Sequence, residues 1–371
     1  MNIDGKAELK RTYIWGTGKI AKYVYHFYYN ELESYNIVGC IDNDKAKEGK
    51  TFEGTDIRIF RPDVLKCDQQ SQVIILAAAY QEIEQQIIND YPWMCGRVQS
   101  PLLFTKQRLI SRYKSTGNEE IKDILCYLKD HPLQVFNYEF TAKYNNRNYD
   151  IVYDEQAGLF YTMFENKRMY FARNLDSEEK VIDYYRQVRL EQDIESPHKY
   201  LHEDFQVDSN SVVIDAGVAE GNFALSVIDK VKKIYLFESD PDWIEALKYT
   251  FAPYSDKVIL VNKYLSDYVD ASTVSVDSLV EEEQIDFMKL DIEGEEYYAL
   301  EGARNTISSS TRMKCVVCTY HKEFDYIALS QLLQGFGFDI ETSKGYMWFP
   351  YDRNSIYDLP TLRRVLIRAK K

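Results

Sequence analysis

The sequence has fewer positive than negative charges. Its 371 residues carry 45 Lys and Arg against 59 Asp and Glu, so the formal net charge is −14 and the pI is about 5.0. Proteins that bind nucleic acid usually present a basic face, and this balance argues against a nucleic-acid partner. A local basic patch stays open, because net charge does not show how the charges are distributed.

Long apolar runs are missing as well. No segment reaches the length of a membrane span, and the start, MNIDGKAELKRTYIWG, has no apolar stretch of signal-peptide length. We therefore expect a cytoplasmic protein. Six cysteines in a chain of this length do not form a disulfide framework. Cys315 and Cys318 form a CxxC inside an apolar run, where positions i and i+3 of a strand face opposite sides, so we expect two core residues.

The first third of the chain has the order of a nucleotide-binding domain. An apolar run in RTYIWGTGKI leads into Gly16-Thr17-Gly18, and Ala21 completes a GxGxxA pattern. A second apolar run, Ile37–Ile41, ends in Asp42, 26 residues after Gly16, and a third spans Val73–Ala79. Two βα units in this order predict a parallel sheet with right-handed crossovers.

This region is similar to the Rossmann domains that accompany many sugar-modifying enzymes. In a functional interpretation, Gly16 and Gly18 approach a pyrophosphate and Asp42 takes a ribose hydroxyl. In a structural interpretation, the glycines only shape the turn and the helix packing. A lone GxGxxA is a weak signal, so a nucleotide in this domain stays open as a cofactor.

The middle of the chain separates two domains. We assign residues 1–105 to the Rossmann-like domain, 106–145 to a helical connector and 146–371 to a second domain. Asn118–His131 has helical spacing in the connector, and Tyr149–Phe171 alternates as hairpins do, with Glu165-Asn166 at a turn. Ser177–Gln192 is helical in pattern, with Ser177 as its cap.

The last part of the chain alternates apolar runs with helical segments. The runs predict five successive strands, at Val212–Asp215, Ile234–Glu238, Val258–Val261, Asp286–Asp291 and Lys314–Tyr320. The helical segments between them are Phe223–Lys230, Trp243–Phe251, Glu295–Asn305 and Ile327–Phe336. Two further runs, Phe338–Ile340 and Arg364–Ile367, would close the sheet as an antiparallel edge. The predicted fold class is α/β with two Rossmann-like doubly wound domains, and the reversed edge marks the second as a class I methyltransferase fold.

The turn after the first of these strands points to a nucleoside. In VVIDAGVAEGNF an apolar run ends in an acid and glycines, and Glu238 ends the next strand 21 residues after Gly217. A buried strand, a glycine turn and an acid at the tip of the next strand are how α/β sheets hold a nucleoside. The turn lacks a full GxGxxG, which argues against a pyrophosphate. S-adenosylmethionine (SAM), which has a ribose but no phosphate, fits better.

Several motifs together resemble one family. IDAGVAEGNFAL, LFESDPDWIEAL, VSVDSL, IDFMKLDIEGEEYYALEGA and CTYHKEFDYIALSQLLQGFGF look like the FkbM family of SAM-dependent O-methyltransferases. The resemblance covers about residues 190–350 and leaves the Rossmann-like region outside. It implies an enzyme of the EC 2.1.1 class that methylates a hydroxyl of a sugar, glycan or similar small natural product. Residues 146–371 would then be an FkbM-like domain with a preceding hairpin and helix.

The positions of the residues in the predicted strands and turns suggest which of them bind the cofactor. Asp215, Gly217 and Gly221 would border the methionine end of SAM, and the two acceptor oxygens of Glu238 suit the ribose diol. Tyr264, Ser266 and Asp267 are candidates near the adenine. The full set of cofactor-binding residues that we predict is Asp215, Gly217, Glu220, Gly221, Asn222, Glu238, Ser239, Tyr264, Ser266 and Asp291.

Roles in catalysis centre on the fourth and fifth strands. Asp291 would face the sulfonium or take the substrate proton, and His321 would act as general base near neutral pH, unless it is a structural histidine. Glu293 either contacts substrate or caps the next helix. His198 either lines the pocket or belongs to a structural turn, and we expect Tyr320 to contact the substrate. Asp291 with Glu293 offers no clear ligand set, so no metal is assigned.

Two functions from different classes remain. The first is a SAM-dependent O-methyltransferase in polysaccharide biosynthesis, with a carbohydrate or sugar-nucleotide acceptor as partner. The second is a nucleotide-sugar or dinucleotide binding module with a non-catalytic methyltransferase fold. For either function we expect no nucleic acid and no membrane span, and a homodimer could form.

Overall fold

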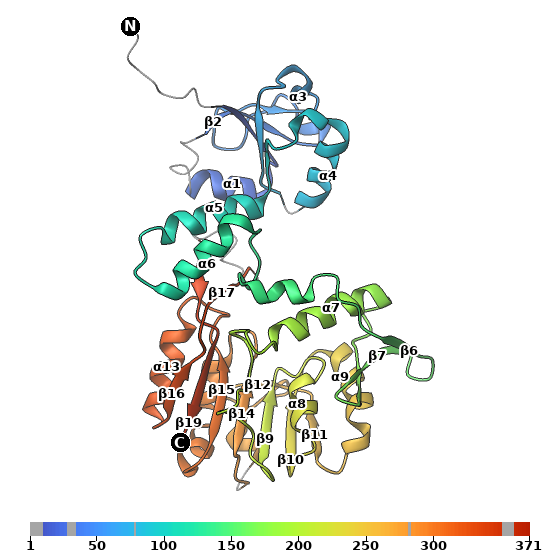
Figure 1. Ribbon diagram of the computed structural model, residues 1–371, viewed down its shortest axis with the longest axis vertical. Helices are drawn as coiled ribbons and strands as arrows, with labels where there is room; N and C mark the ends of the chain where they lie inside the picture. Colours follow the sequence, from blue (N-terminus) through green and yellow to red (C-terminus); the bar gives the residue numbers. More distant parts are fainter. Residues whose placement is uncertain (1–9, 28–34, 78, 281–282, 351–359) are drawn as a thin grey trace. The chain divides into compact units, whose positions relative to one another are not determined.

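The computed structural model describes residues 10–27, 35–77, 79–280, 283–350 and 360–371. The chain forms two compact units, one of residues 1–134 with 350–361 and the other of residues 135–349 with 362–371 (Figure 1). Each unit is built on a sheet of mainly parallel strands, which confirms the α/β class. The division after residue 134 falls inside the segment 106–145 that we predicted as a connector.

The first unit contains a five-stranded parallel sheet in the order β3-β2-β1-β4-β5. The two predicted βα units form its centre, and the predicted third strand, Val73–Ala79, is shorter and becomes β4; Ala78 lies outside the described residues. Its strands are β1 (Arg11–Trp15), β2 (Asn36–Ile41), β3 (Ile59–Phe60), β4 (Gln72–Ile75) and β5 (Val98–Gln99). Its helices are α1 (Lys19–Phe27), α3 (Val64–Cys67), α4 (Tyr80–Asp90), α5 (Pro101–Tyr113) and α6 (Glu119–Asp130), with short 3-10 turns at Lys45–Lys47 and Pro92–Met94.

The second unit contains a seven-stranded sheet in the order β11-β10-β9-β14-β15-β19-β16. Only β19 runs against its neighbours, so the predicted reversed edge is confirmed. The strands are β9 (Val212–Ala216), β10 (Lys233–Phe237), β11 (Val258–Val261), β14 (Phe287–Leu290), β15 (Lys314–Cys318), β16 (Asp339–Thr342) and β19 (Leu366–Lys370). The helices beside them are α8 (Asn222–Val227), α9 (Pro241–Phe251), α10 (Val276–Val280), α11 (Glu296–Glu301), α12 (Arg304–Ser309) and α13 (Asp325–Gly335).

Smaller elements surround this sheet. A three-stranded antiparallel sheet precedes it, and Glu165 and Asn166 at its β7–β8 turn both have positive φ, which confirms the predicted hairpin. Helix α7 begins after Ser177, whose hydroxyl accepts the backbone N–H of Lys180 as predicted. These elements are a 3-10 turn at Glu139–Tyr144, β6 (Ile151–Asp154), β7 (Leu159–Phe164), β8 (Lys167–Tyr170), α7 (Glu178–Glu191), a 3-10 turn at Ala252–Tyr254, β12 (Tyr264–Leu265), β13 (Thr273–Val274), β17 (Met347–Trp348) and β18 (Leu362–Arg363).

The large sheet is buried on both faces. Val213 of β9 packs into one hydrophobic core together with α8 and α9, and Val212 and Ile214 pack into a second core with α11, α12 and α13. Strands covered on both sides are mostly apolar, which explains why they appear as apolar runs; the exceptions Asp215 of β9 and Lys289 of β14 form an ion pair with each other. Cys315 and Cys318 lie in opposite cores, as the strand alternation predicted.

One predicted helix is wrong. The segment Glu295–Asn305 forms two helices, α11 and α12, with Gly302 between them. A Cβ atom at Gly302 would lie 2.1 Å from the carbonyl oxygen of Ser266, so the chain passes the neighbouring backbone too closely for any other residue. Helical spacing alone could not reveal this contact.

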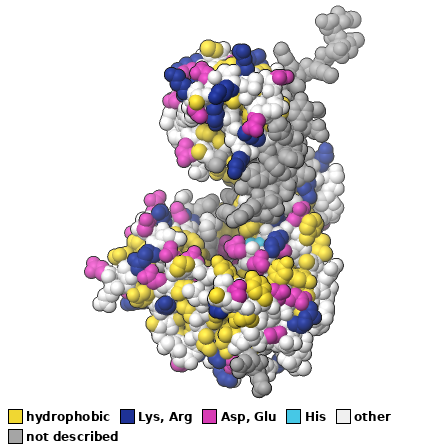
Figure 2. All heavy atoms as spheres, turned by 180° about the vertical axis from the view of Figure 1, so that it is seen from behind, with side chains coloured by type: hydrophobic (Ala, Val, Ile, Leu, Met, Phe, Trp, Pro, Cys, Tyr) yellow, Lys and Arg dark blue, Asp and Glu magenta, His cyan; other side chains and the backbone are white. Residues whose placement is uncertain are grey.

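Charges of both signs are interspersed on the face of the molecule seen in Figure 2, where a histidine is visible beside acidic side chains. The excess of acid is therefore not gathered into one patch on that face. Among the described residues, no helix has both the length and the apolar character that crossing a bilayer requires.

The turn after β9 is the tightest point of the second unit. Gly217 has φ of +74°, and a Cβ atom there would lie 1.7 Å from the carbonyl oxygen of Asp291. The backbone N–H of Asp291 donates to Ala216 O at 3.1 Å. Only glycine allows the ends of β9 and β14 to approach this closely.

Replacing Gly217 by alanine should destabilise the second unit. The overlap with Asp291 and the left-handed backbone together should cost at least about 2 kcal/mol in free energy of unfolding. Urea unfolding followed by circular dichroism measures this loss. Gly335→Ala is the control, because no atom would lie within 4 Å of its Cβ at the end of α13. Equal losses in the two variants would contradict the close-contact explanation.

Candidate active site

Four loops meet at one edge of the large sheet. The neighbouring strands β10, β9, β14 and β15 are parallel, so the loops that follow them share the carboxyl-terminal edge. These loops carry Glu238, Gly217, Asp291 and Tyr320. In open α/β sheets this edge is where ligands bind.

Glu238 ties two of these loops together. Its carboxylate accepts the backbone N–H of Ala219 at 3.0 Å, and those of Ser239 at 2.7 Å and Asp240 at 2.9 Å. Ala219 has φ of +46°, so this contact holds the glycine turn in a conformation that a non-glycine residue rarely adopts. Glu220, in the same turn, accepts the hydroxyl of Tyr184 at 2.6 Å.

An ion pair lies buried beneath the turn. Nζ of Lys289 is 3.1 Å from Oδ1 of Asp215, and both side chains are almost fully buried. Lys289 also donates to the carbonyl oxygens of Ala216 and Gly217. Burial raises the pKa of Asp215. Burial would lower the pKa of Lys289, but the carboxylates of Asp215 and Asp291 outweigh it and raise that pKa.

Asp291 is surrounded by donors. The hydroxyl of Tyr200 donates to its Oδ2 at 2.6 Å and that of Tyr320 to its Oδ1 at 2.9 Å. His321 Nε2 lies 3.4 Å from Oδ1, and His198 Nε2 lies 3.7 Å from Oδ2. The cluster joins β14, β15 and the segment ahead of β9, which are far apart in sequence.

The charge of Asp291 is stabilised by its neighbours. Burial would raise its pKa, but the positive charge of Lys289, followed by His198 and His321, lowers the pKa well below its ordinary value. The carboxylate is therefore ionised over the whole working range of pH.

The tautomer of His198 follows from its neighbours. Oε1 of Gln192 accepts the backbone N–H of Tyr200 at 3.2 Å, so Nε2 of that amide is the donor toward His198 Nδ1 at 3.3 Å. The proton of His198 then lies on Nε2, which donates to the hydroxyl oxygen of Tyr320 at 3.1 Å. Burial lowers the pKa of His198 to about 4, so this ring is neutral at neutral pH. It orients Tyr320 toward Asp291.

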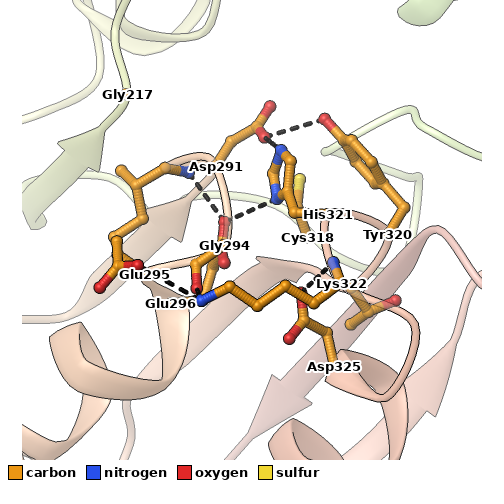
Figure 3. A network of polar contacts seen from close by, with 12 residues as sticks. Gly217, Asp291, Gly294, Glu295, Glu296, Cys318, Tyr320, His321, Lys322 and Asp325 are labelled. Carbon is orange, nitrogen blue, oxygen red and sulfur yellow. Dashed lines mark hydrogen bonds and ion pairs between the residues drawn. The ribbon is translucent and has the colours of Figure 1, made fainter. Parts of the chain in front are cut away.

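His321 has the opposite charge state. Its Nδ1 lies 3.0 Å from Oε1 of Glu296 and its Nε2 faces Asp291, so the ring is held between two carboxylates (Figure 3). Burial would lower the pKa of His321, but the contact with Glu296 and then the charge of Asp291 raise it to about 9. Glu296 is positioned in turn by the backbone N–H of Ile292, which donates to it at 2.8 Å.

Two sets of donor atoms lie within 4.8 Å of one another and could hold a metal ion, His198 with Asp291 and Cys318, and Asp291 with Glu296 and His321. In the first set, Nε2 of His198 carries a proton and cannot ligate. In the second, the carboxylates face opposite nitrogens of one imidazole, whereas metal ligands converge on a single centre. The arrangement fits an imidazolium held by two carboxylates.

The structure gathers most of the predicted site residues. Asp215, Gly217, Glu238, Asp291, His198, Tyr320 and His321 lie in the connected set described above, and Glu220, Gly221, Asn222 and Ser239 belong to the same turns. The predicted adenine residues are separate. Tyr264 is 60% exposed on β12, Ser266 packs against Gly302, and among the described residues no hydrogen bond or ion pair joins either to Glu238 or Asp291.

The predicted capping role of Glu293 is wrong. Helix α11 follows Glu295, and no side chain caps it. Glu293 is exposed with φ of +57°, and within the described residues its carboxylate makes no hydrogen bond or ion pair. It stays free to face a ligand at the edge of the sheet.

The predicted nucleotide site of the first unit is largely occupied by its own side chains. The carboxylate of Asp42 accepts Lys47 Nζ at 2.8 Å, the backbone N–H of Asp44 at 2.8 Å and the hydroxyl of Thr17. A Cβ atom at Gly16 would lie 2.6 Å from Leu76 O, which explains that glycine by the turn alone. Gly18 has no atom within 4 Å of a Cβ position, so it alone leaves room for a ligand.

Sequence reasoning missed three residues of the site, Glu296, Tyr200 and Lys289. Lys289 had a visible signal, since a lysine inside the apolar strand FMKL needs a buried partner. Tyr200 follows the predicted His198 by two residues, but tyrosine is frequent in this chain. Glu296 follows another glutamate, and nothing in the sequence shows which of the two turns inward.

Comparisons with known protein families identify a methyltransferase-related region in the second unit. The family model described as the methyltransferase FkbM domain matches residues 244–340, which include Asp291, Glu296 and His321. This match supports a methyltransferase. A second family model, C2185-like, N-terminal, matches residues 8–91. No curated protein matches.

Solved structures with similar folds are distant. Methyltransferase FkbM from Methylobacillus flagellatus KT is 14% identical over 97% of this chain and 90% of its own, with a TM-score of 0.43. An rRNA methylase from Streptococcus thermophilus is 16% identical, covering 44% of this chain and 89% of its own, with a TM-score of 0.29. SMU.1697c from Streptococcus mutans, solved with SAH, is 14% identical, covering 44% of this chain and 91% of its own, with a TM-score of 0.29. At such TM-scores the likeness says nothing about function.

The two histidines should titrate on opposite sides of neutrality. The chain has five histidines, so NMR can follow each imidazole separately. We expect His321 to stay protonated until about pH 9 and His198 to stay neutral down to about pH 4. In Glu296→Gln, loss of the carboxylate should bring the pKa of His321 down toward 6.5. A His321 that titrates near 6.5 in the unmodified protein would contradict the ion-pair assignment.

Proposed function

We propose that this protein is a SAM-dependent O-methyltransferase that acts on a hydroxyl of a sugar, a glycan or a related small natural product. The match to the methyltransferase FkbM domain supports the reaction class. The observation that carries the proposal is the cluster of Asp291 and His321 beside the glycine turn of β9. We place the reaction in cytoplasmic polysaccharide biosynthesis.

The residues at the edge of the sheet fit SAM. Both carboxylate oxygens of Asp215 are buried; Oδ1 is paired with Lys289 at 3.1 Å, and Oδ2 accepts no hydrogen bond within the described residues. A buried acceptor without a hydrogen bond suits the ammonium group at the methionine end. Glu238, at the tip of β10, would hold the ribose, beside Gly217 and Gly221. When bound, SAM supplies a methyl group on a sulfonium, which is a good leaving group.

The chain itself must orient the acceptor hydroxyl and take its proton. We infer that Asp291 orients the hydroxyl and that Nε2 of His321 takes the proton, because both face the same place. Glu296 holds the other ring nitrogen of His321 and is a positioning residue. We first expected His198 and Tyr320 to contact the substrate. Both side chains are buried, which instead supports a role in holding Asp291 in position.

Glu238 should be required for SAM binding. In Glu238→Ala the ribose loses its acceptor and the turn loses its contact with Ala219, so we expect calorimetric titration with SAM to show at least a tenfold weaker Kd. Glu245→Ala, on the following helix, should bind normally, since Glu245 pairs with Arg173 at the surface.

Titrations with NAD and a UDP-sugar complete this experiment. Absence of SAM binding together with a clear signal from either of these ligands would overturn the proposal. It would favour the nucleotide-binding module instead.

The rate of methyl transfer should rise with pH. A base must be unprotonated, so kcat/KM should increase about tenfold per pH unit until pH 9, where His321 loses its proton. Glu296→Gln should shift this limb to lower pH, because the carboxylate that raises the pKa is gone. His321→Gln should lose turnover but keep SAM binding.

His202→Gln is the control for the pH profile. His202 lies on the surface, and this variant should retain the profile of the unmodified protein. An unchanged rate in His321→Gln would reject the assignment of the base.

A further inference from the structure

A cavity of about 450 Å³ lies in the second unit, on the far side of Tyr200 from Asp291. It is bounded by α7, the β7–β8 turn, the segment 199–206 and α8, of which α7, β7 and α8 are labelled in Figure 1. It contains none of Gly217, Glu238 or Asp291, and it meets the predicted SAM site at one residue, Asn222, which lies in its wall. Its volume is in the range of pockets for small molecules, which is about 300–1,000 Å³.

The lining of this cavity is cationic. Arg189, Lys199 and Lys230 line it, and the only carboxylate among its lining residues is the exposed Glu165. None of the three cations forms an ion pair within the described part of the chain. This is unusual in a protein with 59 acidic and 45 basic residues. A cluster of cations without counter-ions is how a protein prepares a site for an anion.

Neighbouring residues on the same helix behave differently. Lys180 of α7 pairs with Asp176 at 2.7 Å, and Arg186 pairs with Asp183 at 2.6 Å. These pairs lie outside the cavity. Lys180 and Arg186 of α7 therefore form ion pairs with carboxylates, whereas Arg189, which lines the cavity, does not within the described residues.

Two of the cations are held in place without being neutralised. The guanidinium of Arg189 lies 5.9 Å from the ring centre of Phe164 and 6.0 Å from that of Tyr185. These aromatic contacts help to fix the group; burial would lower the pKa of Arg189, but its contact with Tyr185 raises that pKa. Lys199 donates to the backbone carbonyl of Gln192 at 2.9 Å, and burial lowers its pKa although the carboxylates of Asp193 and Glu165 act in the opposite direction.

The cavity shares two walls with the candidate active site. Tyr200 lines it and places its hydroxyl on Asp291, and Gln192 lines it and bonds to His198. Aromatic rings of Phe164, Tyr200 and Phe223 also border it, and such faces suit the C–H face of a sugar ring.

We propose that this cavity binds the anionic group of a sugar substrate, a phosphate or a carboxylate, through Arg189 and Lys199 with Lys230 at the rim. The inference rests on the proposed function, because it specifies the acceptor as an anionic carbohydrate. The anion anchors the sugar, and Tyr200 and Gln192 connect this anchor to the cluster around Asp291.

Calorimetric titration of the full chain tests this proposal with three probes, glucose 1-phosphate, glucuronate and neutral glucose. We expect glucose 1-phosphate or glucuronate to bind, with an affinity that falls as salt is added, and glucose to bind far more weakly. Whichever anionic probe binds identifies the source of the charge. Arg189→Gln and Lys199→Gln should each weaken its binding about tenfold or more.

Two further variants make the test decisive. Lys180→Gln, on the same helix but outside the cavity, should bind like the unmodified protein. Lys230→Glu changes an exposed residue, so it tests the charge of the site even if Arg189→Gln fails to fold. Binding of neither anionic probe, or binding that survives all three cavity variants, would overturn the proposal.

SAM titrations on the same variants separate the two proposals. SAM should bind the cavity variants normally, because Arg189, Lys199 and Lys230 do not belong to the predicted set of SAM-binding residues. A protein that binds the anionic probe through Arg189 and Lys199 but never binds SAM would support the anion site and reject the methyltransferase.

Discussion

A carboxylate taken out of water must be surrounded by donors and positive charge, and Asp291 imposes this requirement on the second unit. Tyr200 and Tyr320 donate to it, and His198, His321 and Lys289 lie around it. These residues come from the segment ahead of β9 and from two adjacent strands. The position of one charge thus determines where three separate parts of the chain must meet.

The same requirement divides the two histidines. His198 receives an amide proton on one nitrogen, has no carboxylate on that side and stays neutral. His321 has a carboxylate on each side and becomes a cation. Two chemically identical side chains near one aspartate therefore differ in charge because of a single neighbour, Glu296.

The sequence predicted the framework better than the chemistry. Apolar runs predicted the seven strands of the large sheet and the three central strands of the smaller one, because strands buried on both faces are continuous apolar runs; the two-residue edge strands β3 and β5 were not predicted. Strand order then placed Gly217, Glu238, Asp291 and His321 at one edge. The break at Gly302, the inward turn of Glu296 and the exposure of Tyr264 depend on contacts between distant segments, which periodicity does not contain.

The first unit shows why a glycine motif is a weak guide. Its GxGxxA turn and Asp42 have the expected spacing, yet Asp42 is already paired with the ammonium of Lys47 and the hydroxyl of Thr17, whereas Glu238 accepts only backbone N–H groups within the described residues. Spacing predicts where an acid will lie, but only its partners show whether it has an acceptor oxygen left for a ligand. Binding of a nucleotide in this unit stays a prediction.

The close approach of Gly217 to the carbonyl of Asp291 also limits how the site can move. With the two backbones in contact, the turn after β9 and the tip of β14 behave as one rigid piece. The opposite wall, the segment that carries His198 and Tyr200, is fixed in another way: Arg368 donates to the carbonyl oxygens of Lys199 and Tyr200, and the Tyr200 hydroxyl donates to Asp291. A ligand at Asp291 would therefore meet a preformed site on both sides, one held by backbone contact and the other by side-chain hydrogen bonds.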